Sequence, residues 1–455
     1  MATRIIVLAA GKGTRMKSAI PKVLHPLAGK PLLTHVVDTV AGLNPAGITV
    51  VIGHGAEQVR QSLSNRSDLK LHWAVQEEQL GTGHAVQQGL DNIADDDDVL
   101  ITYGDVPLTR GATYQALLDA CNAQNIGLLT LLMDDPTGYG RIIRDGGVIV
   151  GVVEQKDATD DQLTISEVNA GVVAIKGGSL RSLLARLDNN NAQGEYYLTD
   201  IHKLAVKEGL HVTAVHPEDA WETDGVNSRS QLARLERIHQ QHVAEQLMAS
   251  GVSLADPDRL DVRGTLETGT DVSIDINCVF EGHCTVGSDV SIGPNCLITG
   301  SHIADGSVIL ANCVLENATV GENTTVGPFA RLRPGTTLGA GVRIGNFVET
   351  KNAQIGNASK VNHLSYVGDS VVGTNVNVGA GTITCNYDGA NKHQTTIEDD
   401  VFVGSNSALV APVTLGAGST VGAGSTIARN VPARRLSLSR GKQIEIENWT
   451  RPVKK

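Results

Sequence analysis

The sequence predicts an α/β protein in which a Rossmann-like domain is followed by a parallel β-helix. Aliphatic segments alternate with helical segments through the first half of the chain, as in α/β sheets. From about Val272 to Ile427 an aliphatic residue returns every six positions. A mostly polar helical stretch, residues 228–250, separates the two patterns. We therefore expect a first domain over residues 1–229, a linker helix over 230–250 and a second domain over 251–455.

The elements of the first domain follow from its aliphatic runs. These runs predict strands at Arg4–Leu8, Ile48–Ile52, Leu71–Val75, Val99–Tyr103 and Gly127–Met133. Helical segments lie between them, among them Leu32–Leu43 and Gly83–Leu90. The alternation favours a parallel sheet, whose ligands bind at the carboxyl ends of the strands.

The six-residue period of the second domain fits neither an α-helix, which repeats about every 3.6 residues, nor a single strand, which repeats about every 2. It fits a triangular solenoid in which each hexapeptide forms one flat face. The aliphatic residue points into a thin core and its small neighbour lets the backbone turn, as in Val286-Gly287 and Ile292-Gly293. The low aromatic content, 3%, fits a core too narrow for large rings.

Charge and cysteine usage narrow the functional class. A net charge of −12 argues against a nucleic-acid binder or an anionic-membrane binder. The six cysteines contain no C-x-x-C pair, and Cys278, Cys284 and Cys296 fall at repeat spacing, so we interpret them as reduced core thiols. No apolar run is long enough for a secretory signal or a membrane span, so we expect a cytoplasmic protein.

A glycine-rich loop, Gly11-Lys12-Gly13-Thr14-Arg15, follows the first strand. Its backbone N–H groups can approach phosphate oxygens, and Lys12 and Arg15 add positive charge. It is not a Walker A loop, and a tight structural turn is the alternative. With Pro21-Lys22, five residues after Arg15, the loop resembles the signature of sugar-1-phosphate nucleotidylyltransferases.

Later motifs extend this resemblance. Gln76 with Gly81-Thr82-Gly83 resembles the base-recognition segment of that family, and Asp105 and Asn227 match its two magnesium contacts. For Asp105, a turn carboxylate is an equal alternative. Ala170 departs from the Thr that the family often has. The resemblance implies a nucleotide and sugar site formed by Leu8, Ala9, Ala10, Gly11, Lys22, Gln76, Gly81, Thr82, Tyr103, Gly104, Asp105, Gly140, Glu154, Asn169 and Asn227.

The chemistry of such a site requires positioning and charge neutralisation. A sugar phosphate oxygen attacks the α-phosphorus of UTP and pyrophosphate leaves, so the nucleophile is already anionic and needs no base. Mg²⁺ on Asp105 and Asn227 would neutralise charge together with Arg15 and Lys22, our candidate catalytic cations. The acidic run Asp95–Asp98 lacks ligand spacing, and we interpret it as a solvated turn.

A second site is expected where the repeat fails, because the repeat itself is only a scaffold. The longest break is Thr384–Thr396, and His363 precedes it near a probable corner. A lone histidine is more often structural. Polar residues that could gather on its side, given coils of about 18 residues, are Arg333, Glu349, Lys351, Tyr366 and Asn377.

The segments Gly379–Gly389 and His363–Tyr366 resemble the family of bacterial enzymes that combine N-acetylglucosamine-1-phosphate uridyltransferase and glucosamine-1-phosphate acetyltransferase. The resemblance covers nearly the whole chain. It implies a left-handed β-helix, a homotrimer and acetyl-CoA bound between neighbouring helices. His363 would be the catalytic base, oriented by Glu349. Arg333 and Lys351 would bind the sugar phosphate, and Tyr366 and Asn377 the sugar. Acetyl-CoA would contact Ala380, Asn386, Tyr387, Ser405, Ala423 and Arg440.

The sequence thus predicts a bifunctional enzyme that makes UDP-N-acetylglucosamine by acetyl transfer and then uridylyl transfer. Its partners would be small molecules (UTP, sugar phosphates and acetyl-CoA), with Mg²⁺ as cofactor and no nucleic acid or membrane. One alternative is a nucleotidyltransferase with a non-catalytic β-helix, which leaves His363 and the Thr384–Thr396 loop without a role. The other is a binding scaffold, which leaves the glycine-rich loop and Asp105 unexplained.

Overall fold

The computed structural model describes residues 2–452 and 454. It divides into two compact units between His239 and Gln240, and each unit is described by itself. The division falls inside helix α8 (Arg229–Ala249), the linker helix that the sequence predicts. The finer boundaries, 1–229, 230–250 and 251–455, stay predictions. Among the described residues, no helix has the length and apolar character needed to cross a membrane.

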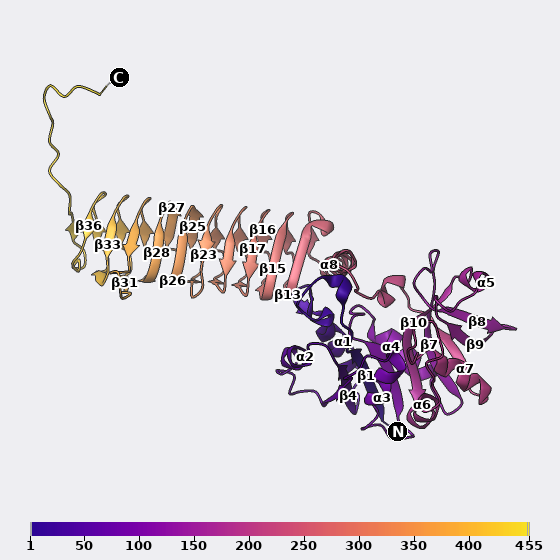
Figure 1. The fold of residues 1–455 in the computed structure, drawn as a ribbon. Helices are drawn as coiled ribbons and strands as arrows, with labels where there is room; N and C mark the ends of the chain where they lie inside the picture. Colours follow the sequence, from indigo (N-terminus) through magenta and orange to yellow (C-terminus); the bar gives the residue numbers. More distant parts are fainter. Residues whose placement is uncertain (1, 453, 455) are drawn as a thin grey trace. The chain divides into compact units, whose positions relative to one another are not determined.

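The first unit is built on a sheet of order β11-β7-β10-β6-β1-β4-β5, to which the β8–β9 hairpin is attached through β10 (Figure 1). Its strands are β1 (Thr3–Ala9), β4 (Gly47–Ile52), β5 (Leu71–Val75), β6 (Asp98–Tyr103), β7 (Asn125–Leu132), β8 (Arg141–Asp145), β9 (Val148–Val153), β10 (Glu167–Lys176) and β11 (His211–Val215). The small pair β2 (Pro26–Leu27) and β3 (Lys30–Pro31) lies apart. All five strands expected from the aliphatic runs are present.

The prediction of a parallel sheet is wrong for β10, which runs antiparallel to both β6 and β7. A parallel connection requires a crossover of a dozen or more residues, usually a helix. Between β7 and β10 the chain instead forms the β8–β9 hairpin and one short helix, α5 (Asp160–Leu163). A sequence pattern reports burial and says nothing of strand direction.

Helices cover both faces of this sheet. They are α1 (Leu32–Ala41), α2 (Ala56–Ser62), α3 (Thr82–Gln88), α4 (Gly111–Ala120), α6 (Gly177–Leu184) and α7 (Asp200–Lys207), with short 3-10 turns η1 (Thr14–Met16), η2 (Lys22–Leu24) and η3 (Ala220–Thr223). Successive residues of β1 serve opposite faces: Ile6 and Leu8 join one apolar cluster, and Ile5 and Val7 join the other. Both faces are therefore buried, which explains why the strand reads as a continuous aliphatic run.

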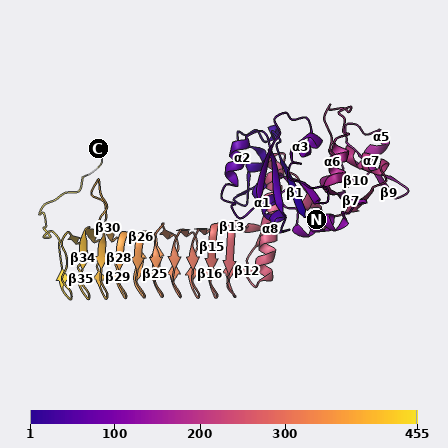
Figure 2. The ribbon, with the colours of Figure 1, turned by 90° about the horizontal axis from the view of Figure 1, so that it is seen from below.

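The second unit is the expected parallel β-helix (Figures 1 and 2). One sheet contains β12 (Ser253–Leu254), β14 (Ser273–Ile274), β16 (Ser291–Ile292), β19 (Val308–Ile309), β22 (Thr325–Val326), β25 (Arg343–Asn346), β27 (Lys360–His363), β29 (Asn377–Val378), β32 (Phe402–Val403), β35 (Thr420–Val421) and β37 (Leu436–Ser437). The other contains β13 (Leu260–Thr268), β15 (Cys278–Val286), β17 (Leu297–Thr299), β18 (His302–Ile303), β20 (Val314–Glu316), β21 (Thr319–Val320), β23 (Arg331–Leu332), β24 (Thr337–Leu338), β26 (Glu349–Ile355), β28 (Tyr366–Val372), β30 (Ile383–Cys385), β31 (Thr395–Ile397), β33 (Ala408–Val410), β34 (Val413–Leu415) and β36 (Thr426–Ile427). A short turn, η4 (Pro257–Arg259), precedes β13.

Coils of 17 or 18 residues stack the six-residue repeat into columns. Ile274 pairs in register with Ile292, which in turn pairs with Ile309, and all three are buried. Cys278, Cys284 and Cys296 are buried free thiols in the same core, as predicted. Aliphatic and thiol side chains of successive coils therefore stack along one narrow core. This is expected for a solenoid, because a single coil cannot bury its own apolar face and must pack against its neighbours.

Two features interrupt this regularity. Ser370 pairs with Thr395, a step of 25 residues, because the loop between β30 and β31 is inserted into one coil. Within the loop, Tyr387 and Lys392 form an isolated bridge. The strands also continue past Ile427, where the six-residue period ends in the sequence, since β37 pairs with β35.

Candidate active sites

The first site lies where strands β1 and β6 end, as expected for an α/β sheet. One cavity is lined by ten of the predicted residues: Leu8, Ala9, Ala10, Gly11, Lys22, Gln76, Gly81, Thr82, Tyr103 and Asp105. A second cavity is lined by Arg15, Tyr103, Asp105, Gly140, Glu154, Asn169 and Asn227. Tyr103 and Asp105 line both, so the two cavities share a wall. Gly104 lines neither and faces Leu33 in the core.

The glycine-rich loop leaves room at one glycine and packs tightly at the other. Gly13 has φ +60°, and a Cβ there would lie 2.6 Å from Cβ of Lys22. A Cβ at Gly11 would meet nothing within 4 Å. Gly13 therefore allows the loop to pack on Lys22, while Gly11 keeps the backbone open to the cavity.

The predicted base-recognition segment is fixed by hydrogen bonds. Nε2 of the buried Gln76 donates to the Gly81 carbonyl at 3.1 Å. Gly81 has φ +112°, and a Cβ there would lie 2.5 Å from the carbonyl oxygen of Tyr196. Gln79, which the sequence did not single out, also lines the cavity, and its Nε2 donates to the Ala10 carbonyl at 2.8 Å. Its position between Gln76 and Gly81 was the available signal.

Asp105 and Asn227 converge on one cation, the ammonium group of Lys22. Nζ of Lys22 forms an ion pair with Asp105 and donates to Oδ1 of Asn227 at 3.0 Å. The backbone N–H of Val226 donates to the Asp105 carbonyl at 2.9 Å, which holds the two segments together. A carboxylate and an amide oxygen suit Mg²⁺, which usually takes one or two protein ligands and completes its shell with phosphates and water. Among the described residues, no cluster of three or more His, Cys, Asp or Glu side chains could hold a metal alone.

The second cavity carries a buried carboxylate and a constrained tyrosine. Burial, followed by neighbouring Asp200 and Asp157, raises the pKa of Glu154, which accepts a hydrogen bond from Oγ1 of Thr199 at 2.9 Å. Burial, with Glu154 and Asp105 nearby, raises the pKa of Tyr103, so its hydroxyl stays neutral. This wall therefore offers hydrogen-bond groups rather than positive charge, which suits the hydroxyls of a sugar.

The interpretation of Asp95–Asp98 as a solvated turn is wrong for Asp97. This carboxylate is 5% exposed, accepts hydrogen bonds from the N–H groups of Ala2 and Ala94, and pairs with Arg4 at 3.5 Å. Desolvation opposes these contacts, but they hold the pKa of Asp97 below its ordinary value. It anchors the start of β1.

In the second unit, His363 ends β27 and is exposed at a corner of the coil. Its Nδ1 lies 2.8 Å from Oδ1 of Asn346, which the β25–β27 register places beside it. Glu349, the predicted orienting residue, instead accepts from Nη1 of Arg333 at 2.9 Å. Its predicted role stays a prediction, and Asn346 is a contact that the sequence did not reveal.

Positive charge gathers beside the inserted loop. Lys392, followed by Arg333, lowers the pKa of Lys351 because a second nearby cation disfavours its charged form. Nδ2 of Asn386, in the same loop, donates to Asp369 and lies 3.5 Å from the hydroxyl of Tyr366. Lys392 is absent from our predicted site residues, although the repeat break contained it. The cluster can bind a phosphate group.

The predicted acetyl-transfer residues lie on two different sheets of one chain. Glu349, Lys351 and Tyr366 are on β26 and β28, whereas Asn377 is on β29 of the other sheet. Ala380, Ser405 and Ala423 follow successive strands of that other sheet, and Tyr387 is exposed on the inserted loop. Arg440 lies beside this column, since a Cβ at Gly424 would be 3.6 Å from its Cδ. The geometry in one chain thus divides the predicted site into two parts.

Three family models match parts of the chain: a MobA-like NTP transferase domain over residues 5–138, a GMPPB C-terminal domain over 262–346 and a hexapeptide repeat of succinyl-transferase over 394–429. A "Bifunctional protein GlmU" from Herminiimonas arsenicoxydans is 54% identical over 99% of both chains. Another, from Paraburkholderia phymatum, is 56% identical over 99% of both chains. A solved nucleotidyl transferase from Methanothermobacter thermautotroptrophicus is 18% identical, covers 52% of this chain and 96% of its own, and has a TM-score of 0.38, a likeness too weak to add to these matches.

Proposed function

The chain belongs to the family of bifunctional GlmU proteins, and on this premise we propose how its two units divide the synthesis of UDP-N-acetylglucosamine. It is an enzyme with a nucleotidyltransferase half and an acetyltransferase half built of hexapeptide repeats. Acetyl transfer from acetyl-CoA to glucosamine 1-phosphate precedes uridylyl transfer from UTP to the acetylated sugar phosphate. The observation that carries the first assignment is the convergence of Asp105 and Asn227 on one cation beside the glycine-rich loop.

In the first site, the cavity with Gln76 and Gly81 would hold the uracil base, and the cavity with Glu154 and Asn169 would hold the sugar. The phosphate oxygen of N-acetylglucosamine 1-phosphate attacks the α-phosphorus of UTP, and the bond to pyrophosphate breaks. Lys22 and Arg15 neutralise the phosphates. Asp105 and Asn227 would hold Mg²⁺, which supplies further charge neutralisation when bound.

In the second site, the amine of glucosamine 1-phosphate attacks the thioester carbonyl of acetyl-CoA. Oδ1 of Asn346 only accepts hydrogen bonds, so Nδ1 of His363 carries its proton and Nε2 keeps a lone pair. Nε2 takes the proton that the amine loses as the N–C bond forms. The C–S bond then breaks, and Nε2 returns the proton to the sulfur, so that coenzyme A leaves as the thiol. Lys351, Arg333 and Lys392 would bind the sugar phosphate.

A second copy of the chain would complete the acetyl-transfer site. Lys351 lies on one sheet of this chain and Asn377 lies on the other sheet. Hexapeptide repeats are consistent with oligomerisation. We therefore expect a homotrimer in which neighbouring helices share each acetyl-CoA, with Asn386 and Tyr387 from one copy facing Ala380, Ser405, Ala423 and Arg440 of the next. A cytoplasmic location remains our expectation.

The test is the separate loss of two activities. Asp105→Asn should abolish uridylyl transfer and leave acetyl transfer unchanged, because the two sites lie in different units. His363→Ala should do the reverse. Each activity is measured alone by mass spectrometry of the product, from N-acetylglucosamine 1-phosphate and UTP or from glucosamine 1-phosphate and acetyl-CoA. Normal acetyl transfer in His363→Ala would refute the second site.

A further inference from the structure

We propose that Glu222 is a positioning residue for the cation site at Asp105 and Asn227, an inference that rests on the proposed function of that site. Glu222 lies in η3 (Ala220–Thr223), five residues before Asn227, and lines neither cavity. It is 0% exposed, so its carboxylate acts only through the groups that it contacts.

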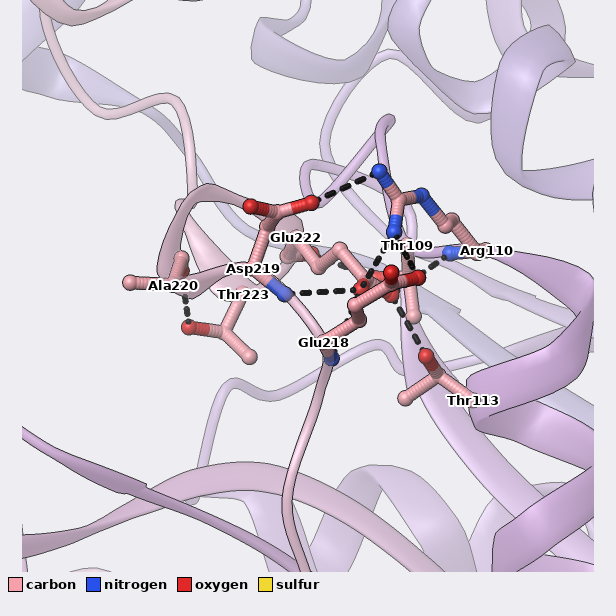
Figure 3. A network of polar contacts seen from close by, with 8 residues as sticks. All are labelled: Thr109, Arg110, Thr113, Glu218, Asp219, Ala220, Glu222 and Thr223. Carbon is pink, nitrogen blue, oxygen red and sulfur yellow. Dashed lines mark hydrogen bonds and ion pairs between the residues drawn. The ribbon is translucent and has the colours of Figure 1, made fainter.

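The Glu222 carboxylate is surrounded by donors from two segments of the chain (Figure 3). Oε2 accepts from the backbone N–H of Arg110 at 3.1 Å and from Oγ1 of Thr113 at 2.5 Å. Oε1 accepts from the N–H groups of Glu218 and Asp219 at 3.1 and 3.3 Å. A buried carboxylate is costly unless its hydrogen bonds are satisfied, and here both oxygens are.

These contacts connect the two segments that carry the cation ligands. One segment runs from Asp105, after β6, to Thr113 in α4. The other runs from Glu218 to Asn227, between β11 and α8. The Oγ1 of Thr109 donates to the Glu222 carbonyl at 2.7 Å, which adds a third hydrogen bond between the segments to those from Arg110 and Thr113.

Arg110 strengthens the same junction from the surface. Its guanidinium pairs with Glu218 at 2.6 Å and Asp219 at 2.7 Å (Figure 3). It also lies 4.8 Å from the ring centroid of Trp221. These side chains are partly exposed, so each pair is worth little alone. Glu222 is the buried carboxylate of the network, and its loss would release the segment that ends at Asn227.

Loss of Glu222 would change the relative positions of Asp105 and Asn227 rather than the charge at the metal. Asp105 and Asn227 are 122 residues apart in sequence. The Lys22 ammonium contacts both side chains and Val226 bonds to the Asp105 carbonyl, and the Glu222 network adds the hydrogen bonds that connect the segments behind them. Removing a group that orients metal ligands typically weakens metal binding about 10- to 100-fold. Because Glu222 acts one step further away, we expect the lower end of this range.

The experiment measures Mn²⁺ binding to the full chain by electron paramagnetic resonance, without nucleotide and with UTP. Glu222→Gln keeps the size of the side chain and replaces one acceptor by a donor. We expect about tenfold weaker Mn²⁺ binding and a matching rise in the Mn²⁺ concentration needed for uridylyl transfer. Acetyl transfer should be unchanged, because that site lies in the second unit. Glu218→Gln is the matched control, because that side chain is 83% exposed and contacts the same Arg110.

Normal Mn²⁺ affinity in folded Glu222→Gln would overturn the inference. If that variant fails to fold, Thr113→Val removes a single donor, and unchanged Mn²⁺ affinity in this variant would overturn it equally. Asp105→Asn distinguishes a failure of the proposed cation site from a failure of the inference about Glu222. If it retains Mn²⁺ binding, both the proposed cation site and this inference fall, whereas a defect confined to Glu222→Gln and Asp105→Asn supports both.

Discussion

His202 should make the stability of the first unit fall in mild acid. This side chain in α7 is 0% exposed, and neither ring nitrogen has a hydrogen-bond partner. Burial lowers its pKa from 6.5 to about 4. The unfolded chain therefore binds a proton near pH 6.5, while the folded chain resists it until about pH 4.

The sign and size of the effect follow from this difference. The contribution of neutral His202 to the free energy of unfolding is fully present above pH 6.5. It declines as the pH falls toward 4, because only the unfolded state gains the proton. Each pH unit in this window is worth about 1.36 kcal/mol, so the loss is about 2 kcal/mol at pH 5 and about 3 kcal/mol at pH 4. His202→Leu removes the titrating group and should remove this share of the decline.

The assay is urea unfolding at several pH values, followed by tryptophan fluorescence. Of the three tryptophans, Trp73 and Trp221 lie in the first unit, whereas Trp449 is already exposed in the folded chain, so the change in signal reports unfolding of the first unit. Between pH 7.5 and pH 5, wild type should lose about 2 kcal/mol more than His202→Leu. The exposed His211→Leu serves as control and should follow wild type. Parallel pH curves for wild type and His202→Leu would refute the reasoning.

Two further predictions concern the substrate sites. Gly81→Ala should weaken UTP binding at least tenfold, roughly 1.4 kcal/mol, because the added Cβ would meet the Tyr196 carbonyl and the φ of Gly81 is positive. The control is Gly194→Ala, where an added Cβ meets nothing within 4 Å. A normal KM for UTP in Gly81→Ala would contradict this prediction. A chain ending before Arg440 should show a raised KM for acetyl-CoA and unchanged uridylyl transfer, since Arg440 lies beside Gly422 and Gly424. An unchanged KM for acetyl-CoA would show that the residues from Arg440 onward take no part in the acetyl-CoA site.

Local sequence patterns predicted the strands and coils well, because buried residues recur along the sequence with the period of the element that buries them. The six-residue period marked the coils, and the aliphatic runs marked the strands. Strand direction has no such periodicity, so the expectation of a parallel sheet did not anticipate the antiparallel β10. Side-chain partners far apart in sequence were equally hidden. Glu222 contacts Arg110 across 112 residues, and no spacing rule connects them.

The same limit explains what was missed at the second site. Asn346 and His363 are 17 residues apart, one coil, but many residues share that spacing and only the structure shows which side chains meet. Asp97 was interpreted as solvated because an acidic run usually is, whereas two of its partners, the N–H of Ala2 and the side chain of Arg4, come from the start of the chain.

The central claim is that two independent sites in one chain act in sequence, and mixing two defective variants tests it most directly. Asp105→Asn and His363→Ala are each given glucosamine 1-phosphate, acetyl-CoA, UTP and Mg²⁺, separately and together. Neither alone should make UDP-N-acetylglucosamine, and the mixture should, because the acetylated sugar phosphate made by Asp105→Asn diffuses to the intact uridylyl site of His363→Ala. Product from either variant alone, or none from the mixture, would contradict the account.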